Sequence, residues 1–254
     1  MSDAIEVFVT DLDHTLLHPE TKDIPDALPD LLEEWMERGN KWVIATGRDR
    51  SHLEDVMDEL RLRPNYYITR SRYIHPGTSR NHPELDEWNR KIEDLLEKQD
   101  RYADKWIPKL RDWVEKKGMD VDLKDGYAMF ESPSDAETAF HYLSDVIAEG
   151  FKVLRNHEFL IVVPAQTGKG NCLKHLSETR NWQESEIFCV GDGMNDANML
   201  DGDYDYKKAA VANAEPKLKD LVAQHGGIIL EHVGGDAIEH LLRTLMDDTQ
   251  SSKD

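Results

Sequence analysis

The sequence predicts an α/β fold in which a doubly wound, Rossmann-like parallel sheet carries an inserted α+β domain. Short apolar runs alternate with amphipathic helical patterns towards both ends of the chain, which is typical of βαβ units. Between these regions the composition becomes polar and helix-rich. A length of 254 residues allows one domain that carries a smaller one. We therefore expect residues 1–70 and 164–254 to form a core domain and residues 71–163 to form an insert.

The first part of the core domain contains three apolar runs of strand type, separated by two helical patterns. Strands that are buried in a parallel sheet read as continuous apolar runs, so we expect helices on both faces of the sheet. The expected elements are a strand from Val7, a helix over Leu28–Met36 that stops at Gly39, a strand over Lys41–Ala45, a helix marked by Leu53, Val56, Met57 and Leu60, and a strand over Tyr66–Thr69.

The insert combines charged helices with a few strands. Its tryptophans are expected to fill the interior, as this residue type usually does. The expected elements are helices over Leu85–Lys98, Tyr102–Lys117 and Ala136–Ala148, and strands over Tyr127–Glu131, Phe151–Arg155 and Phe159–Val163, the last two joined by a turn over Asn156–Glu158.

The doubly wound pattern resumes after Gly168. A helix carries Leu173 and Leu176, and the strand over Ile187–Val190 leads into a polar loop. The remaining expected elements are a short strand at Ala209–Asn213, a helix over Pro216–Ala223, a strand over Gly227–Leu230 and a closing helix over Ala237–Met246.

The composition argues against several classes of partner. The chain has 31 basic and 51 acidic residues, a net charge of -20, and no stretch concentrates Lys and Arg, so nucleic acids and anionic membranes are not expected to bind. Acidic residues interrupt the N-terminal region and no apolar run reaches membrane-spanning length, which favours a cytoplasmic protein. Cys172 and Cys189 match no metal-binding spacing and are expected to be buried free thiols.

The motif DLDHT places two carboxylates, Asp11 and Asp13, where a buried strand ends. A carboxylate in this position is costly to desolvate unless a cation pairs with it, and a Mg²⁺ ion would provide that charge. The alternative is that Asp13 and Thr15 form an Asx-turn or a helix cap.

Three further polar motifs follow strands or precede helices. In GDGMND, Asp192, Asn195 and Asp196 follow a strand, and Asp196 occupies the position where a dinucleotide-binding loop needs glycine. ATGR and TGKGN supply an anion-binding turn and a lysine, although turn chemistry and a surface lysine are the alternatives. Ligands bind at the carboxyl ends of strands in open α/β sheets, so convergence of four motifs there indicates one site.

These four motifs, in this order and with an α/β insert between the second and the third, resemble the haloacid dehalogenase superfamily of aspartate-nucleophile phosphotransferases. The position and size of the insert resemble the larger cap of the sucrose-phosphatase and sugar-phosphatase branch. The resemblance covers nearly the whole chain.

The resemblance implies a role for each motif. Asp11 would be the nucleophile that forms an aspartyl-phosphate, and Asp13 the general acid and base. Mg²⁺ would be held by the side chains of Asp11 and Asp192 and by the backbone carbonyl of Asp13, with Asp196 steadying Lys169 or a metal-bound water. The phosphate oxygens would be held by Thr46, the Gly47 N–H, Lys169 and Asn195.

The sequence therefore predicts a Mg²⁺-dependent phosphatase that acts on a small phosphorylated metabolite, in particular a sugar phosphate. A phosphomutase of the phosphomannomutase type is an alternative because related mutases share this kind of cap. A metabolite-binding protein without catalysis is a third possibility, but it would not need Asp11, Asp13, Lys169 and Asp192 together. Arg70 and Arg72 could contribute to a pocket for an anionic substrate or could be ordinary surface residues.

Overall fold

The computed structural model describes residues 4–77, 82–124, 127–156 and 158–251, and it confirms the predicted α/β fold with a parallel central sheet. The chain divides into two compact units. Unit 1 comprises Met1–Asp86 and Lys169–Asp254, and unit 2 comprises Glu87–Gly168.

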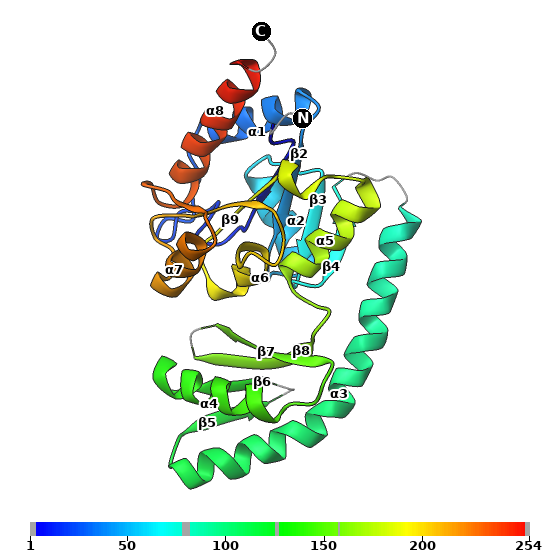
Figure 1. Ribbon diagram of the computed structural model, residues 1–254, viewed down its shortest axis with the longest axis vertical. Coiled ribbons are helices and arrows are strands. Elements are labelled where there is room, and N and C mark those ends of the chain that lie inside the picture. Colours follow the sequence, from blue (N-terminus) through cyan, green and yellow to red (C-terminus); the bar gives the residue numbers. More distant parts are fainter. Residues whose placement is uncertain (1–3, 78–81, 125–126, 157, 252–254) are drawn as a thin grey trace. The chain divides into compact units, whose positions relative to one another are not determined.

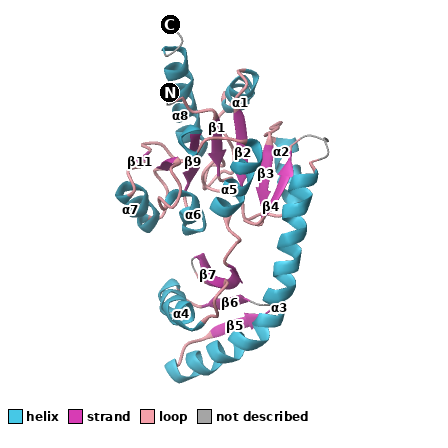
Figure 2. Ribbon diagram, turned by 45° about the vertical axis from the view of Figure 1, so that its right-hand side comes forward, coloured by secondary structure: helices cyan, strands magenta, loops and turns pink. Residues whose placement is uncertain are grey.

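Unit 1 is built on a seven-stranded sheet in the order β11-β10-β9-β1-β2-β3-β4 (Figure 2). All neighbouring strands are parallel except β3 and β4, which are antiparallel. The central strand β1 is buried along its whole length, as expected for the apolar run that begins at Val7. The bounds are β1 Val7–Thr10, β2 Lys41–Ala45, β3 Tyr66–Thr69, β4 Tyr73–Pro76, β9 Ile187–Gly191, β10 Lys207–Ala210 and β11 Ile228–Ile229.

The helices of unit 1 cover both faces of this sheet. The strand order runs one way from β1 to β3 and the opposite way from β9 to β11, so right-handed crossovers place α1 and α2 on one face and α6 and α7 on the other. Helix α8 packs against α1, and α5 packs against α6 (Figure 1). The bounds are α1 Leu28–Glu37, α2 Arg50–Glu59, α5 Lys169–Arg180, α6 Ala197–Leu200, α7 Pro216–Gln224 and α8 Gly234–Ser251, with short 3-10 helices at Glu184–Glu186 and Met194–Asp196.

Several predicted boundaries in unit 1 differ from the observed ones. Strand β4 was not predicted; it extends the core sheet by pairing with β3, for example Ile74 with Ile68. Because β4 belongs to this sheet, unit 1 continues beyond the expected boundary at residue 70. After unit 2 it resumes at Lys169, whereas residue 164 was expected. Strand β10 begins at Lys207, two residues before the expected Ala209, because Lys207 and Lys208 already pair with β9.

Unit 2 contains a four-stranded antiparallel sheet in the order β5-β6-β8-β7, with α4 packed on it. The two helices predicted before this sheet form one helix, α3, which continues through Pro108. Strand β5 was not predicted, and the expected turn at residues 156–158 includes His157, which lies outside the described residues. The bounds are α3 Pro83–Lys117, β5 Val121–Lys124, β6 Tyr127–Phe130, α4 Pro133–Val146, β7 Phe151–Asn156 and β8 Phe159–Pro164.

The interior of unit 2 forms between α3, α4 and the sheet. Trp106 and Leu110 of α3 and Leu143 of α4 are buried in one cluster. Trp113 stacks on Tyr142 with ring centroids 4.6 Å apart, so the tryptophans of α3 contribute to the packing as predicted. In the described part of the chain, the helices lack the combination of length and apolarity that a membrane crossing requires.

Candidate active site

The site is organised around a buried lysine held between two carboxylates. Asp11 directly follows β1 and is only 4% exposed, while Lys169 is the first residue of α5 and is completely buried. The Lys169 Nζ lies 2.7 Å from an oxygen of Asp11 and 2.5 Å from an oxygen of Asp196. Burial alone would lower the pKa of the Lys169 ammonium, but Asp11 and Asp196 outweigh it and raise that pKa above its ordinary value. Lys169 therefore remains a cation.

The loop after β9 is folded around Asp196. One carboxylate oxygen of Asp196 accepts hydrogen bonds from the backbone N–H groups of Asp192, at 3.0 Å, and Gly193, at 3.2 Å. A Cβ atom at Gly191 would lie 2.5 Å from that same oxygen, so this close approach requires glycine. Asp196 is thus tied by one oxygen to the loop and by the other to Lys169.

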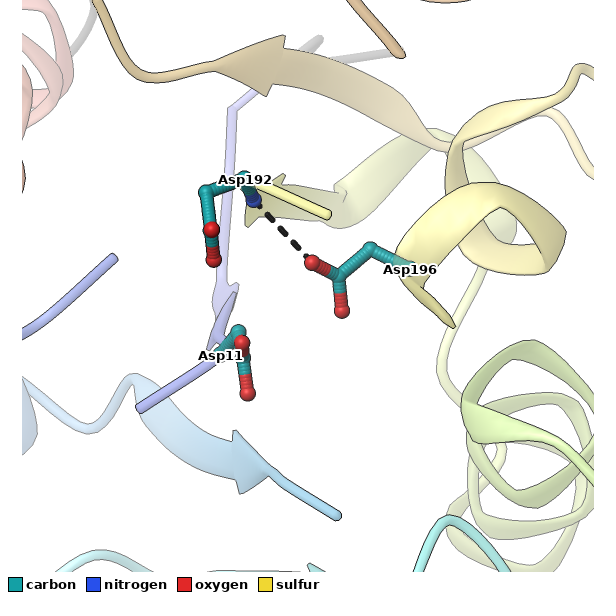
Figure 3. Close-up of side chains that lie close together, drawn as sticks. All are labelled: Asp11, Asp192 and Asp196. Atoms are coloured by element: carbon teal, nitrogen blue, oxygen red, sulfur yellow. Dashed lines mark hydrogen bonds between the residues drawn. The ribbon is translucent and has the colours of Figure 1, made fainter. Parts of the chain in front are cut away.

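Asp11, Asp192 and Asp196 form the cluster of acidic groups shown in Figure 3. One oxygen from each lies within 4.8 Å of the others. Because both oxygens of Asp196 already accept hydrogen bonds, Asp11 and Asp192 are better placed to bind a cation. The division between two metal ligands and one supporting carboxylate stays a prediction.

The electrostatics of the cluster favour an additional positive charge. Burial raises the pKa of Asp11 well above its ordinary value; Lys169 opposes this shift, whereas Asp196 and Asp192 add to it. Burial, followed by the charge of Asp196, raises the pKa of Asp192 to about 7. Three carboxylates around one ammonium leave a negative site, which fits a divalent cation with oxygen ligands.

The two residues that follow Asp13 in the sequence contact Asp192. Thr15 is fully buried and its Oγ1 donates a 2.9 Å hydrogen bond to an oxygen of Asp192. The Nδ1 of His14 lies 3.8 Å from the other oxygen. The sequence did not predict these contacts, although the burial expected so close to a core strand could have drawn attention to Thr15. Thr15 thus connects the first and last motifs of the site instead of capping a helix.

Asp13 lies outside the buried cluster and pairs with Arg48. The Arg48 guanidinium donates to both carboxylate oxygens, at 2.9 Å and 2.5 Å. The two side chains are 37% and 31% exposed, so this pair is open to solvent. Arg48 is the last residue of ATGR, but sequence reasoning assigned roles only to Thr46 and Gly47. Its bidentate geometry fixes the orientation of Asp13.

The remaining predicted residues lie around these two groups. Thr46 is buried, and its Oγ1 accepts a hydrogen bond from the backbone N–H of Arg48. Gly47 is exposed, and the half-buried Asn195 directs an oxygen to within 2.6 Å of the Cβ position of Gly193. Among the described residues, no hydrogen bond joins either Gly47 or Asn195 to the acidic cluster.

Arg70 and Arg72 both contact neighbouring residues of the protein. A guanidinium nitrogen of Arg70 lies 3.8 Å from Asp49, and Arg72 donates to the backbone carbonyl of Arg70 at 3.0 Å. Cys172 and Cys189 are buried thiols, as predicted.

The fold and the acidic site define a hydrolase of the haloacid dehalogenase superfamily with phosphatase activity. The family model described as Sucrose-6F-phosphate phosphohydrolase matches residues 4–229, and the chain belongs to this family.

Individual proteins are similar over nearly the full length. A candidate phosphatase of Haemophilus influenzae is 25% identical over 93% of this chain and 94% of its own. The sucrose-phosphatase of Synechocystis sp. PCC6803, solved with sucrose and phosphate, has a TM-score of 0.70 at 18% identity and covers 96% of this chain and 98% of its own. A Bacteroides thetaiotaomicron phosphatase of the same superfamily has a TM-score of 0.61 at 20% identity, with 97% and 96% covered. At these identities the solved structures establish the shared fold.

Proposed function

We propose that this phosphatase is Mg²⁺-dependent and hydrolyses a sugar phosphate through an aspartyl-phosphate at Asp11. The observation that carries the proposal is the pairing of a buried carboxylate, Asp11, with a buried ammonium, Lys169, beside the second acidic group, Asp192. Phosphoryl transfer depends mainly on alignment and charge compensation, and this arrangement supplies both.

The proposed reaction has two steps. In the first, an oxygen of Asp11 attacks the phosphorus, the bond from phosphorus to the sugar oxygen breaks, and Asp13 gives a proton to the leaving oxygen. In the second, Asp13 takes a proton from water, which attacks the phosphorus and releases phosphate and free Asp11. The bidentate contact from Arg48 positions the ionised Asp13, and at least one of its two hydrogen bonds must open before Asp13 can carry the proton that it gives to the leaving oxygen. Lys169, Thr46, Asn195 and the Gly47 N–H would hold the phosphate oxygens.

The acidic cluster fits the proposed cofactor. Carboxylate and carbonyl oxygens suit Mg²⁺, which would be held by the side chains of Asp11 and Asp192 and by the backbone carbonyl of Asp13. When bound, the ion would reduce the repulsion between the Asp11 carboxylate and an anionic substrate. Asp196 would hold Lys169 and the loop that carries Asp192 in place.

Membership of the sucrose-phosphatase family supports a sugar phosphate as the substrate class. The Synechocystis relative was solved with both sucrose and phosphate, the two products expected from a phosphorylated sucrose. On a protein with a net charge of -20, an anionic phosphate ester needs local positive charge at the site, and Lys169 supplies one such charge.

Phosphate release from a panel of sugar phosphates, including sucrose 6F-phosphate, tests the proposal. We expect release with Mg²⁺, none with EDTA, and none from Asp11→Asn. Asp55→Asn, which changes an exposed carboxylate of α2, is the matched control and should retain wild-type turnover. Absence of release from the whole panel, or turnover by Asp11→Asn, would contradict the proposal. Interconversion of sugar phosphate isomers that depends on a bisphosphate, without net release, would instead identify a phosphomutase.

A further inference from the structure

A cavity lies at the opposite end of the core strands from Asp11. Its volume is about 460 Å³, and its lining includes Phe188, Asp205, Tyr206, Lys207, Lys208 and His225. Phe188 and Lys207 are near the starts of β9 and β10, whereas Asp192 follows the end of β9. In Figure 2 the neighbouring strand β11 forms the outer edge of the sheet. The cavity is therefore separate from the acidic cluster.

Lys208 lines this cavity with a largely buried side chain and has no counter-charge. The residue is only 7% exposed. Within the part of the chain that the structure describes, its ammonium has neither a hydrogen-bond acceptor nor a carboxylate oxygen within 4.0 Å. Its neighbour across the sheet is Cys189, but burial raises the pKa of that thiol, so Cys189 supplies no negative charge at neutral pH. Asp205 lines the cavity but is exposed.

The packing holds the Lys208 stem inside the protein. A Cβ atom at Gly227 would lie 2.5 Å from Cγ of Lys208, 2.6 Å from a methyl group of Val222 and 2.8 Å from the Lys208 carbonyl oxygen. Glycine at position 227 thus leaves the space that the lysine stem fills. The stem is thus held in place, while the ammonium stays within reach of water, as is usual for lysines with buried stems.

We propose that this cavity is an anion-binding site that takes the phosphate group of a small metabolite, with Lys208 as its central ligand. An ammonium on a fixed stem with no carboxylate beside it is available to pair with an anion, and lysine is a common point-charge ligand for phosphate. Lys207 and His225 line the same cavity and add positive or hydrogen-bonding groups around that position. The site is independent of the proposed hydrolysis at Asp11 and would allow a phosphorylated compound to bind away from the catalytic centre.

Calorimetric titration with inorganic phosphate in EDTA tests this site on the full chain. Without a divalent cation, the carboxylates around Asp11 disfavour phosphate binding there. Lys208→Met removes the charge and keeps an apolar stem, so the dissociation constant should rise at least tenfold. Lys208→Arg should restore binding to within a few-fold of the wild type. Lys105→Met, an equal change of charge at an exposed position of α3, should bind phosphate as the wild type does.

Thermal unfolding gives a second, independent readout. Without phosphate, Lys208→Met should melt close to the temperature of the wild type, because the substitution keeps the apolar stem and breaks no ion pair among the described residues. Phosphate, compared with chloride at equal ionic strength, should raise the melting temperature of the wild type but not of Lys208→Met. Equal responses to phosphate in the two proteins, or no phosphate binding by the wild type, would overturn the proposal. Both readouts are independent of turnover, so they also separate this proposal from the one concerning Asp11.

Discussion

The two ends of the core sheet each bury a lysine, but in opposite electrostatic surroundings. At the carboxyl end, Lys169 is fully buried and contacts Asp11 and Asp196. At the amino end, Lys208 is 7% exposed, and the described residues place no carboxylate beside its ammonium. The first lysine completes a network inside the protein, whereas the second leaves a charge that a ligand can satisfy. Burial alone therefore does not distinguish a structural cation from a binding one; the partners do.

The largest difference between the two ends of the sheet is expected when each lysine is replaced by methionine. Lys169→Met leaves Asp11 and Asp196 buried without their cation, so we expect the free energy of unfolding to fall by about 3–5 kcal/mol and phosphatase activity to disappear. Lys208→Met should instead keep both activity and stability. Denaturant unfolding and phosphate release, measured on both variants, check this. If both substitutions lowered the free energy of unfolding by similar amounts, the distinction between the two lysines would be wrong.

A smaller effect is expected at Asp13, which does not contact Lys169. Asp13→Asn should lower turnover by about 100- to 10,000-fold, because it removes the proposed acid and base. It should change stability little, because the ion pair with Arg48 is open to solvent. Acid-quench measurement of phosphoenzyme should show a residual intermediate in Asp13→Asn and none in Asp11→Asn. Identical behaviour of the two variants would argue against separate roles.

The two lysines also show how far the sequence alone could be interpreted. Lys169 could be predicted because a glycine-flanked lysine before a helix belongs to a motif with defined chemistry. Lys208 could not, because its isolation depends on the register with Cys189 and on the space beside Gly227, which involve segments distant in sequence. The same limit applies to Arg48, whose partner Asp13 is 35 positions away.

The fold was predictable where strands are continuous apolar runs, as in β1 and β9. It was less so where pairing or packing decides the structure. Strand β4 exists because it pairs with β3, and its residues alone gave no strong signal. Helix α3 is one continuous helix, and neither the polar stretch around the buried Gln99 nor Pro108 interrupts it. The sequence pattern had favoured a division into two helices.

The dependence on pH should also distinguish the carboxyl end of the core sheet from its amino end, because the acidic cluster includes a carboxyl group with a pKa near neutrality. The pKa of Asp192 is raised to about 7. The folded protein without metal therefore binds more protons than the unfolded chain between about pH 4 and 7, and this contribution to stability is lost as pH rises. Mg²⁺ requires the ionised form, so its affinity should fall by up to about tenfold per pH unit below pH 7.

Calorimetric titration with Mg²⁺ across this range tests the expectation. Asp192→Asn removes the titrating group and should bind Mg²⁺ weakly at every pH, with a flatter profile. Unfolding in EDTA should show a smaller pH dependence for this variant than for the wild type. Equal pH profiles of the two proteins would show that Asp192 does not control the cation site.

The smallest effect is expected from Thr15, which carries no charge but donates a hydrogen bond to Asp192. Its hydrogen bond favours the ionised form of Asp192 and lowers the pKa of that carboxyl against the effect of burial. Thr15→Val keeps the shape of the side chain but removes the donor, worth about 1 kcal/mol, so the ionised fraction of Asp192 and with it the Mg²⁺ affinity at pH 7 should fall by about threefold. Thr138→Val, at an exposed position of α4, should leave affinity unchanged. Above pH 8 the loss in Thr15→Val should shrink, because Asp192 becomes increasingly ionised without the hydroxyl; a loss independent of pH would mean that Thr15 orients Asp192 and does not set its protonation.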